Sequence, residues 1–403
     1  MPISMAGSRG GTIGHSSGTN GVEFAARLLT GRVSFSEFCT QLSGHPCPRS
    51  VTLVVNNTCN LKCAHCYLQV EKLTAPALSE GEWQRLIDSI AEVNPELICL
   101  SGKEVFVGEQ GGRLLSYLRE ARDRTDASSR VGVISNGTLI SRHRETILGA
   151  RPSYFDISLD GIESDHDAVR GEGAFAKAWP NVVWAAETFG QNFFVNLTVQ
   201  KQNFERLTDA VRFLSGHGVQ NVVLGFYMPL PYTDPGLALT QTEFDSVFER
   251  LAEMEDLALD RPLRILFDFD ILILEPFKAF LRSNWFSLNE IQEDANGELF
   301  VEHRLKNGVV LEMRFAPWPA GISKSARITP EGNYLAAEDT VDTTQYAARS
   351  LGNVRDFDFD FEKLHAHARG SVRFRELLRD FYSRVLPELV SLVSSRADSA
   401  VAA

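Results

Sequence analysis

The sequence predicts an α/β fold, a partial (β/α)6 barrel followed by an α+β C-terminal extension. Between residue 51 and about residue 229, short apolar segments alternate six times with segments of helical periodicity. Strict alternation of this kind is typical of a parallel sheet with right-handed crossovers. Six units are too few for the closed eight-stranded barrel, so we expect a barrel that is open on one side.

The 403 residues of the chain exceed the usual size of one hydrophobic core, so we expect a large domain with a smaller companion. Residues 1–20 are rich in Gly and Ser and are expected to be disordered. Residues 21–50 predict two short amphipathic helices, which form a helical cap on the barrel or, alternatively, bind a peptide partner. The partial barrel then takes residues 51–235 and the extension takes residues 236–403.

Charge and hydropathy exclude several classes of partner. The formal net charge of -12 disfavours broad binding to nucleic acid or to anionic membranes, which requires a cationic surface. No apolar run approaches the roughly 20 residues that span a bilayer, and the N-terminus lacks the apolar core of a signal peptide. We therefore expect a cytoplasmic protein without nucleic-acid or membrane partners, in which the six cysteines do not form a disulfide framework.

The sequence predicts alternating strands and helices up to about residue 235. The expected strands are residues 51–56, 97–101, 130–135, 154–159, 193–199 and 222–226, and the expected helices between them are residues 80–93, 112–124, 141–148, 175–189 and 204–216. After about residue 235 the alternation stops; residues 241–257 and 372–395 predict amphipathic helices, and residues 263–280 are strongly apolar. Alternating residues on both sides of Asn307-Gly308 predict a β-hairpin, which we expect to cover the open side of the barrel as a lid or substrate wall.

Three cysteines directly follow the first expected strand. Cys59, Cys63 and Cys66 are spaced four and three residues apart. Iron–sulfur clusters are normally held by four thiolates, so three on one loop would hold three irons of a 4Fe-4S cluster and leave the fourth iron open. A structural zinc site is the alternative, but zinc needs four ligands, usually in paired groups. His65 is adjacent to Cys66 and therefore awkwardly placed as the fourth ligand, and no other Cys-rich stretch follows.

Polar clusters stand at the ends of three further expected strands. They are residues 101–105, 135–138 and 158–161. Ligands of parallel sheets gather at the carboxyl ends of the strands, which is also where the cysteine loop begins. Each cluster alone reads as an ordinary turn or helix cap. Their register with the cysteine loop favours contact with a cofactor.

The spacing CxxxCxxC, with His65 before the last cysteine, resembles the cluster loop of the radical S-adenosylmethionine (radical SAM) enzymes. Residues 102–105 are similar to the Gly-Gly-Glu-Pro segment of that family and residues 135–138 to its Thr-Asn-Gly turn. Residues 158–171 are similar to a Ser-Leu-Asp-Gly stretch, ending in Arg-Gly, of its peptide-modifying branch. Lys103 and Val105 depart from the pattern, and a lysine beside the ammonium group of SAM is repulsive unless its side chain points away.

The resemblance implies one 4Fe-4S cluster bound by Cys59, Cys63 and Cys66, with SAM at the open iron. SAM presents an ammonium, a carboxylate and a ribose diol, and the strand-end residues offer partners for each. We expect Glu104 to accept hydrogen bonds from the ammonium, Ser158 and Asp160 to hold the ribose hydroxyls, and Arg170 to pair with the carboxylate. Asn136 also positions SAM, and His65 and Tyr67 pack beside the cluster or the adenine.

Residues 316–336 and 351–354 resemble the C-terminal extension called SPASM or twitch, whose cysteines bind auxiliary clusters in relatives. No cysteine follows Cys99 in this chain, so we expect a single cluster.

The resemblance implies that SAM is cleaved to a 5'-deoxyadenosyl radical, which abstracts a hydrogen from a peptide or peptide-like natural product. The electron donor is expected to be a flavodoxin or ferredoxin. The alternatives are rearrangement, deamination or oxidation of a small metabolite such as an amino sugar, modification of RNA, which the acidic balance disfavours, and a non-enzymatic iron or zinc protein.

Overall fold

A computed structural model of the protein describes residues 21–43, 48–68, 73, 75–230, 233–256, 258–259, 261–268, 274–283, 285–293, 299–315, 325–336 and 346–401. The prediction of disorder for residues 1–20 lies outside the described residues. So does much of the SPASM-like stretch, namely residues 316–324.

The strands are β1 (Ser50–Val54), β2 (Leu97–Ser101), β3 (Arg130–Ser135), β4 (Tyr154–Ser158), β5 (Phe193–Val199), β6 (Asn221–Phe226), β7 (Arg264–Asp268), β8 (Gln292–Glu293), β9 (Leu299–Arg304), β10 (Val310–Phe315), β11 (Ser325–Ile328) and β12 (Tyr334–Ala336). The α-helices are α1 (Gly21–Leu29), α2 (Phe35–Ser43), α3 (Glu80–Val93), α4 (Gln110–Arg124), α5 (Arg144–Ala150), α6 (Glu163–Arg170), α7 (Ala174–Phe189), α8 (Leu207–Gly216), α9 (Gln241–Ala252), α10 (Leu274–Arg282), α12 (Tyr346–Arg349), α13 (Phe361–Gly370), α14 (Val372–Asp380) and α15 (Leu386–Val401).

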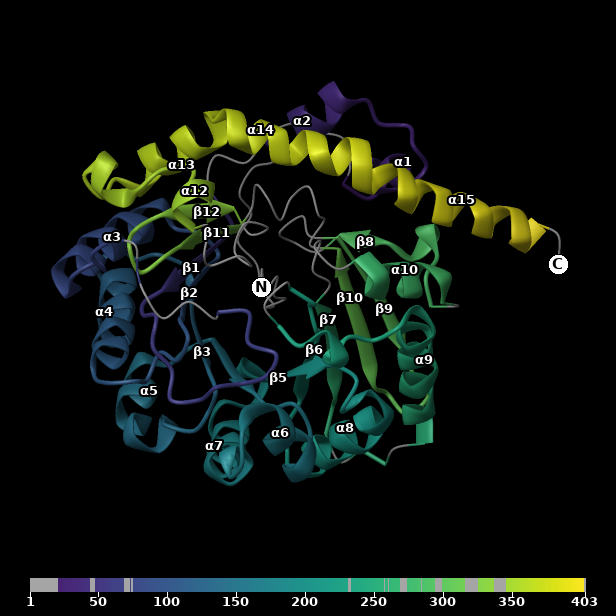
Figure 1. Ribbon diagram of the computed structural model, residues 1–403, viewed down its shortest axis with the longest axis horizontal. Coiled ribbons are helices and arrows are strands. Elements are labelled where there is room, and N and C mark those ends of the chain that lie inside the picture. Colours follow the sequence, from purple (N-terminus) through teal and green to yellow (C-terminus); the bar gives the residue numbers. More distant parts are fainter. Residues whose placement is uncertain are drawn as a thin grey trace.

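The described strands form one 12-stranded sheet in the order β12-β11-β1-β2-β3-β4-β5-β6-β7-β10-β9-β8. Every pair from β11 to β10 is parallel, and the outermost pairs are antiparallel. Figure 1 shows the sheet curled into a half-barrel whose outer face is covered by helices such as α3, α4, α5, α7 and α9. The predicted α/β class and the open barrel are therefore confirmed.

The βα alternation runs one unit further than predicted. Helix α9 leads into β7, which pairs in parallel with β6. The apolar run at residues 263–280 hid this unit, because its first part forms β7 and its last part belongs to α10. A single apolar run does not reveal where a strand ends and a helix begins.

The predicted hairpin forms, but its place differs from the prediction. Strands β9 and β10 are antiparallel around Asn307-Gly308, and Gly308 has the positive φ of 90° that this turn requires. Strand β10 then pairs in parallel with β7, so the hairpin extends the sheet and does not cover its open side. A second hairpin, β11–β12, joins the opposite edge, where β11 is parallel to β1.

The main hydrophobic core lies between the sheet and the helices, and it includes Trp83, Leu86 and Ile87 of α3. Helices α14 and α15, joined by the π-helical turn Phe381–Val385, run along one end of the half-barrel from the side of α3 to the side of α10 (Figure 1). The predicted N-terminal helices pack on this C-terminal helix, with Phe38 stacked on Phe381 at 5.8 Å. None of the described helices combines the length and the apolar character needed to cross a bilayer.

Candidate active site

A cavity of about 600 Å³ opens at the carboxyl ends of β1 to β6, with β11 contributing to its wall. The described residues that line it include eight of the predicted site residues: Cys59, Cys63, His65, Cys66, Tyr67, Asn136, Ser158 and Arg170. The structure thus brings these eight side chains around one space at the strand ends, and their roles stay predictions. Glu104 and Asp160 are not among the lining residues.

The cysteine loop is held by backbone contacts of its own and by α6. The Cys66 amide donates to the Cys63 carbonyl at 3.1 Å, and the Ala64 amide donates to the Val169 carbonyl at 2.8 Å. The Leu61 amide lies 3.3 Å from the Cys59 sulfur. Cys59, Cys63 and Cys66 are half-buried thiols, and burial raises the pKa of each, that of Cys63 to about 11. Metal binding at these thiols must therefore release protons.

The donor set fits an iron–sulfur cluster that is one ligand short. Three half-buried thiols on one loop face the same cavity, and thiolates are the usual ligands of such clusters. A single-ion site is a different matter: in the part of the chain that the structure describes, no three His, Cys, Asp or Glu side chains are grouped closely enough to hold one metal ion.

Arg170 points into the cavity and is oriented by Asp160. Its Nε donates to Oδ2 of Asp160 at 2.6 Å, and Asp160 is fully buried and also accepts from the Thr198 amide at 3.0 Å. Burial alone would raise the pKa of Asp160, but the Arg170 guanidinium outweighs it and holds the pKa well below its usual range. The Asp160 carboxylate is thus bound by Arg170 and by the backbone, whereas Ser158 of β4 lines the cavity. The ribose contacts of both residues stay predictions.

His65 lies against this ion pair. Its Nδ1 is 3.8 Å from Oδ2 of Asp160 and its Nε2 is 3.5 Å from Nη2 of Arg170. Burial lowers the pKa of His65 to about 4, so the ring is neutral at pH 7. A neutral ring can pack beside a cluster without adding charge to it.

Glu104 is 1% exposed, and the protein itself satisfies its carboxylate. It accepts hydrogen bonds from Ser135 Oγ at 2.9 Å, from the Phe106 amide at 3.0 Å and from the Asn136 amide at 2.7 Å. Burial raises the pKa of Glu104 despite these donors. The predicted contact with the SAM ammonium remains a prediction, because here the carboxylate joins the loops after β2 and β3.

Lys103, which departs from the family pattern, does line the cavity. Burial raises the pKa of Cys66, and the Lys103 ammonium opposes this shift. Asn136 also lines the cavity; its Nδ2 donates to Asn60 Oδ1 at 3.0 Å and lies 3.7 Å from the Cys59 sulfur.

Some polar strand residues of the cavity wall were not predicted from the sequence. Asn196 and Thr198 of β5 and Arg327 of β11 line it. The first two are detectable in principle, because polar residues at alternating positions of an apolar strand share one face of the sheet. Nothing in the sequence indicates that Arg327, near the end of the chain, lies beside β1.

The chain is similar to known proteins in sequence and in fold. A model of the radical SAM superfamily matches residues 53–214. The Fe-coproporphyrin III synthase of Methanosarcina barkeri (strain Fusaro / DSM 804) is 30% identical over 210 residues, which cover 51% of this chain and 50% of that protein. The antilisterial bacteriocin subtilosin biosynthesis protein AlbA of Bacillus subtilis (strain 168) is 31% identical over 137 residues, which cover 33% of this chain and 29% of that protein. The chain thus spans half the length of the first relative and less than a third of the second.

The fold is shared with solved structures of SuiB from Streptococcus suis. SuiB bound to S-adenosylmethionine superposes with a TM-score of 0.55 at 16% identity, covering 86% of this chain and 69% of SuiB. SuiB bound to the precursor peptide SuiA gives a TM-score of 0.57 at 14% identity, covering 84% and 70%. At this level of identity the likeness extends to the fold alone.

Proposed function

The chain belongs to the radical SAM superfamily of enzymes, and from this premise we propose that it cleaves SAM reductively at a single 4Fe-4S cluster held by Cys59, Cys63 and Cys66. The observation that carries the proposal is that one cavity brings together three thiols from one loop and the guanidinium of Arg170. When bound, the cluster supplies the electron that breaks a carbon–sulfur bond of SAM and so starts hydrogen abstraction from the substrate.

The residues around the thiols bind and orient. Arg170, held by Asp160, offers its guanidinium to the SAM carboxylate in a charge-assisted hydrogen bond. Asn136 and Ser158 offer hydrogen bonds to the ribose side of SAM, while Glu104 holds the Asn136 backbone in place. His65 and Tyr67 pack beside the cluster and limit the access of water to it.

We propose a peptide or peptide-like substrate. AlbA is named for the biosynthesis of the bacteriocin subtilosin, and SuiB has been solved with its precursor peptide, which supports this class. The similarity to an Fe-coproporphyrin III synthase favours the second candidate, a small-molecule substrate. With no cysteine after Cys99 to hold another cluster, chemistry without net oxidation, or return of the electron to the one cluster, fits best. A flavodoxin or ferredoxin is the proposed electron donor.

Anaerobic reconstitution tests the cluster and the cleavage of SAM. The wild type should bind about four irons per chain, change its electron paramagnetic resonance (EPR) spectrum when SAM is added, and release 5'-deoxyadenosine with dithionite. Cys63→Ala should lose the cleavage, and Cys39→Ala, which changes a half-buried thiol of α2 that is not among the residues lining the cavity, should keep it. A tetrahedral zinc in the wild type, or a cluster whose spectrum ignores SAM, would contradict the proposal.

The substrate class is tested by isotope transfer. Deuterium should move from a deuterated candidate peptide into 5'-deoxyadenosine, since hydrogen abstraction forms that bond. Transfer from a deuterated amino sugar, with none from any peptide, would decide for the small-molecule alternative.

A further inference from the structure

The C-terminal extension touches the thiol loop directly. Leu335 of β12 is fully buried and packs with Leu68, and Cys66 and Tyr67 pack against this pair. Leu68 is the second residue after Cys66. A residue from the last fifth of the chain therefore supports the end of the loop that carries the third thiol.

A second contact lies just beyond, where residues 75–79 lead from the loop into α3. The Glu331 carboxylate accepts a hydrogen bond from the Ala75 amide at 2.7 Å, and the Pro330 carbonyl accepts one from the Leu78 amide at 2.7 Å. Both acceptors lie in the turn between β11 and β12. This turn therefore binds the backbone of the outgoing segment at two points.

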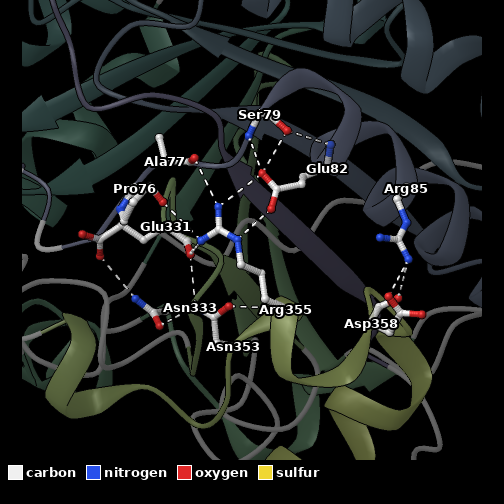
Figure 2. A network of polar contacts seen from close by, with 10 residues as sticks. All are labelled: Pro76, Ala77, Ser79, Glu82, Arg85, Glu331, Asn333, Asn353, Arg355 and Asp358. Atoms are coloured by element: carbon white, nitrogen blue, oxygen red, sulfur yellow. Dashed lines mark hydrogen bonds and ion pairs between the residues drawn. The ribbon is translucent and has the colours of Figure 1, made fainter.

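Arg355 is the centre of this contact (Figure 2). Its Nε and Nη2 donate to the two carboxylate oxygens of Glu82 at 2.7 and 3.2 Å, an arrangement in which both partners are charged. Its Nη1 and Nη2 also donate to the carbonyls of Pro76 and Ala77, each at 3.2 Å. One side chain thus joins the outgoing segment to the first turn of α3.

The backbone of Arg355 is itself held in place within the extension. Asn353 Oδ1 accepts from the Arg355 amide at 3.1 Å, and Asn353 Nδ2 donates to the Glu331 carbonyl at 3.1 Å. Gly332 has a φ of 89°, and a Cβ on it would lie 2.7 Å from Val354, so this turn needs glycine. The turn and residues 353–355 therefore form one unit.

We propose that Arg355 is a positioning residue for the thiol loop, and that Arg355, Glu331, Glu82 and Leu335 together hold the chain that leaves Cys66. Leu335 fixes this chain two residues after the thiol, and the polar contacts fix it from residue 75 onward. The proposal rests on the proposed function only in taking Cys66 as an iron ligand. An extension without cluster cysteines would then support the catalytic cluster mechanically.

The ion pair between Arg85 and Asp358 joins the same two parts of the chain, α3 and the C-terminal extension, and provides a matched control (Figure 2). Arg85 of α3 donates to Asp358 Oδ1 at 2.7 Å, but both side chains are largely exposed and neither contacts residues 75–79 in the described structure. Exposed ion pairs contribute little to stability. Arg85→Gln therefore removes an α3-to-extension contact without touching the outgoing segment.

Hydrogen exchange of the metal-free protein tests the contact without any cluster. In Arg355→Gln the described amides of residues 64–79 should exchange about tenfold faster than in the wild type, because several hydrogen bonds to a charged group are lost. Arg85→Gln should leave these rates unchanged. Equal rates in both variants would overturn the proposal.

Cluster retention tests the consequence. The variants are reconstituted anaerobically and then exposed to a chelator. Arg355→Gln should lose iron faster than Arg85→Gln, although the two variants have the same melting temperature. The EPR signal of Arg355→Gln should also broaden. If Arg355→Gln does not fold, Arg355→Lys replaces it, because lysine keeps the pair with Glu82 but cannot also reach both carbonyls. Unchanged exchange and iron loss in Arg355→Lys would then overturn the proposal. A wild type without a cluster would refute the proposed function, and the exchange rates would still decide about Arg355.

Discussion

The two edges of the sheet are built alike, yet among the residues that the structure describes only one edge reaches the thiols. At each edge a strand of the extension pairs in parallel with a barrel strand, β11 with β1 and β10 with β7, and an antiparallel strand lies outside it. Strand β12 places Leu335 against Cys66. On the other edge, no residue that the structure describes in β9 or β10 lines the cavity.

This difference follows from the order of the chain. The thiol loop leaves the carboxyl end of β1, so the strands beside β1 are the ones near enough to support it. At β7 the added strands β10 and β9 extend the sheet, and they cover an edge that would otherwise be free to pair with another chain. The same arrangement of strands thus has a structural role at β7 and, in our proposal, a functional role at β1.

The largest effects should come from two buried ion pairs, Asp160–Arg170 beside the thiol loop and Glu312–Arg314 at the β10 edge. Asp160→Asn removes the carboxylate that pairs with the buried Arg170, and Glu312→Gln removes a carboxylate that pairs with the buried Arg314 of β10. Each should lower the free energy of unfolding by about 3–5 kcal/mol in urea titrations. SAM binding to the reconstituted protein should weaken only in Asp160→Asn. Equal weakening of SAM binding in both variants would mean that the site around Arg170 and the β10 edge do not differ in function.

The next largest effects should come from buried leucines at the two edges of the sheet. Leu335→Ala in β12 and Leu311→Ala in β10 each truncate a fully buried leucine, and each should cost about 2–5 kcal/mol of unfolding free energy. Iron content after reconstitution should fall in Leu335→Ala and stay at the wild-type level in Leu311→Ala. Iron loss in the β10 variant would mean that lowered stability, and not the loop contact, controls loading.

A pH effect of intermediate size should be found at the β12 edge. His365 of α13 is 2% exposed, and its Nδ1 lies 2.7 Å from the Tyr334 hydroxyl. Burial lowers its pKa from 6.5 to about 4, so between these values the unfolded chain binds a proton that the folded chain does not. This contribution is complete above about pH 6.5 and is lost as the pH falls toward 4.

From pH 7 to pH 5 the loss should be about 2 kcal/mol. Urea titrations at the two pH values measure it, and the difference between wild type and His365→Gln isolates this one group from the other titrating side chains. A difference that does not change with pH would refute the assignment.

Exposed ion pairs should have the smallest effects at either edge. Lys306 pairs with Glu255 near the β9–β10 turn, and its side chain is 87% exposed. Lys306→Gln should leave the midpoint of thermal unfolding unchanged within error, because solvent screens such pairs. A shift as large as that of Leu311→Ala would show that this edge depends on its surface charges.

The sequence predicts the parts of the molecule whose signals are local. Strands β1 to β6 are mostly apolar, as expected for strands buried on both faces. The start of α3 is readable from Ser79 and Glu82, which form a capping box in the structure. The thiol loop is likewise contained in a single short stretch.

The remaining features depend on contacts between distant parts of the chain or on the direction in which a side chain points. Strand β11 has four residues, too few for a clear pattern, and its pairing with β1 cannot be inferred from either segment alone. Glu104 and Asp160 have the residue types of ligand contacts, but a motif does not say whether a carboxylate faces the cavity or its own backbone. The placement of Arg355 combines both difficulties.

The pairing of β1 with β11 also affects how the protein matures. Ser50 and Ser325 are hydrogen-bonded partners 275 residues apart. At a synthesis rate of about 5–20 residues per second, roughly 15–55 s pass between their emergence from the ribosome. During that time the nascent thiol loop lacks the support of the extension, so we expect it to hold iron and sulfide firmly only after β11 and β12 have been synthesised.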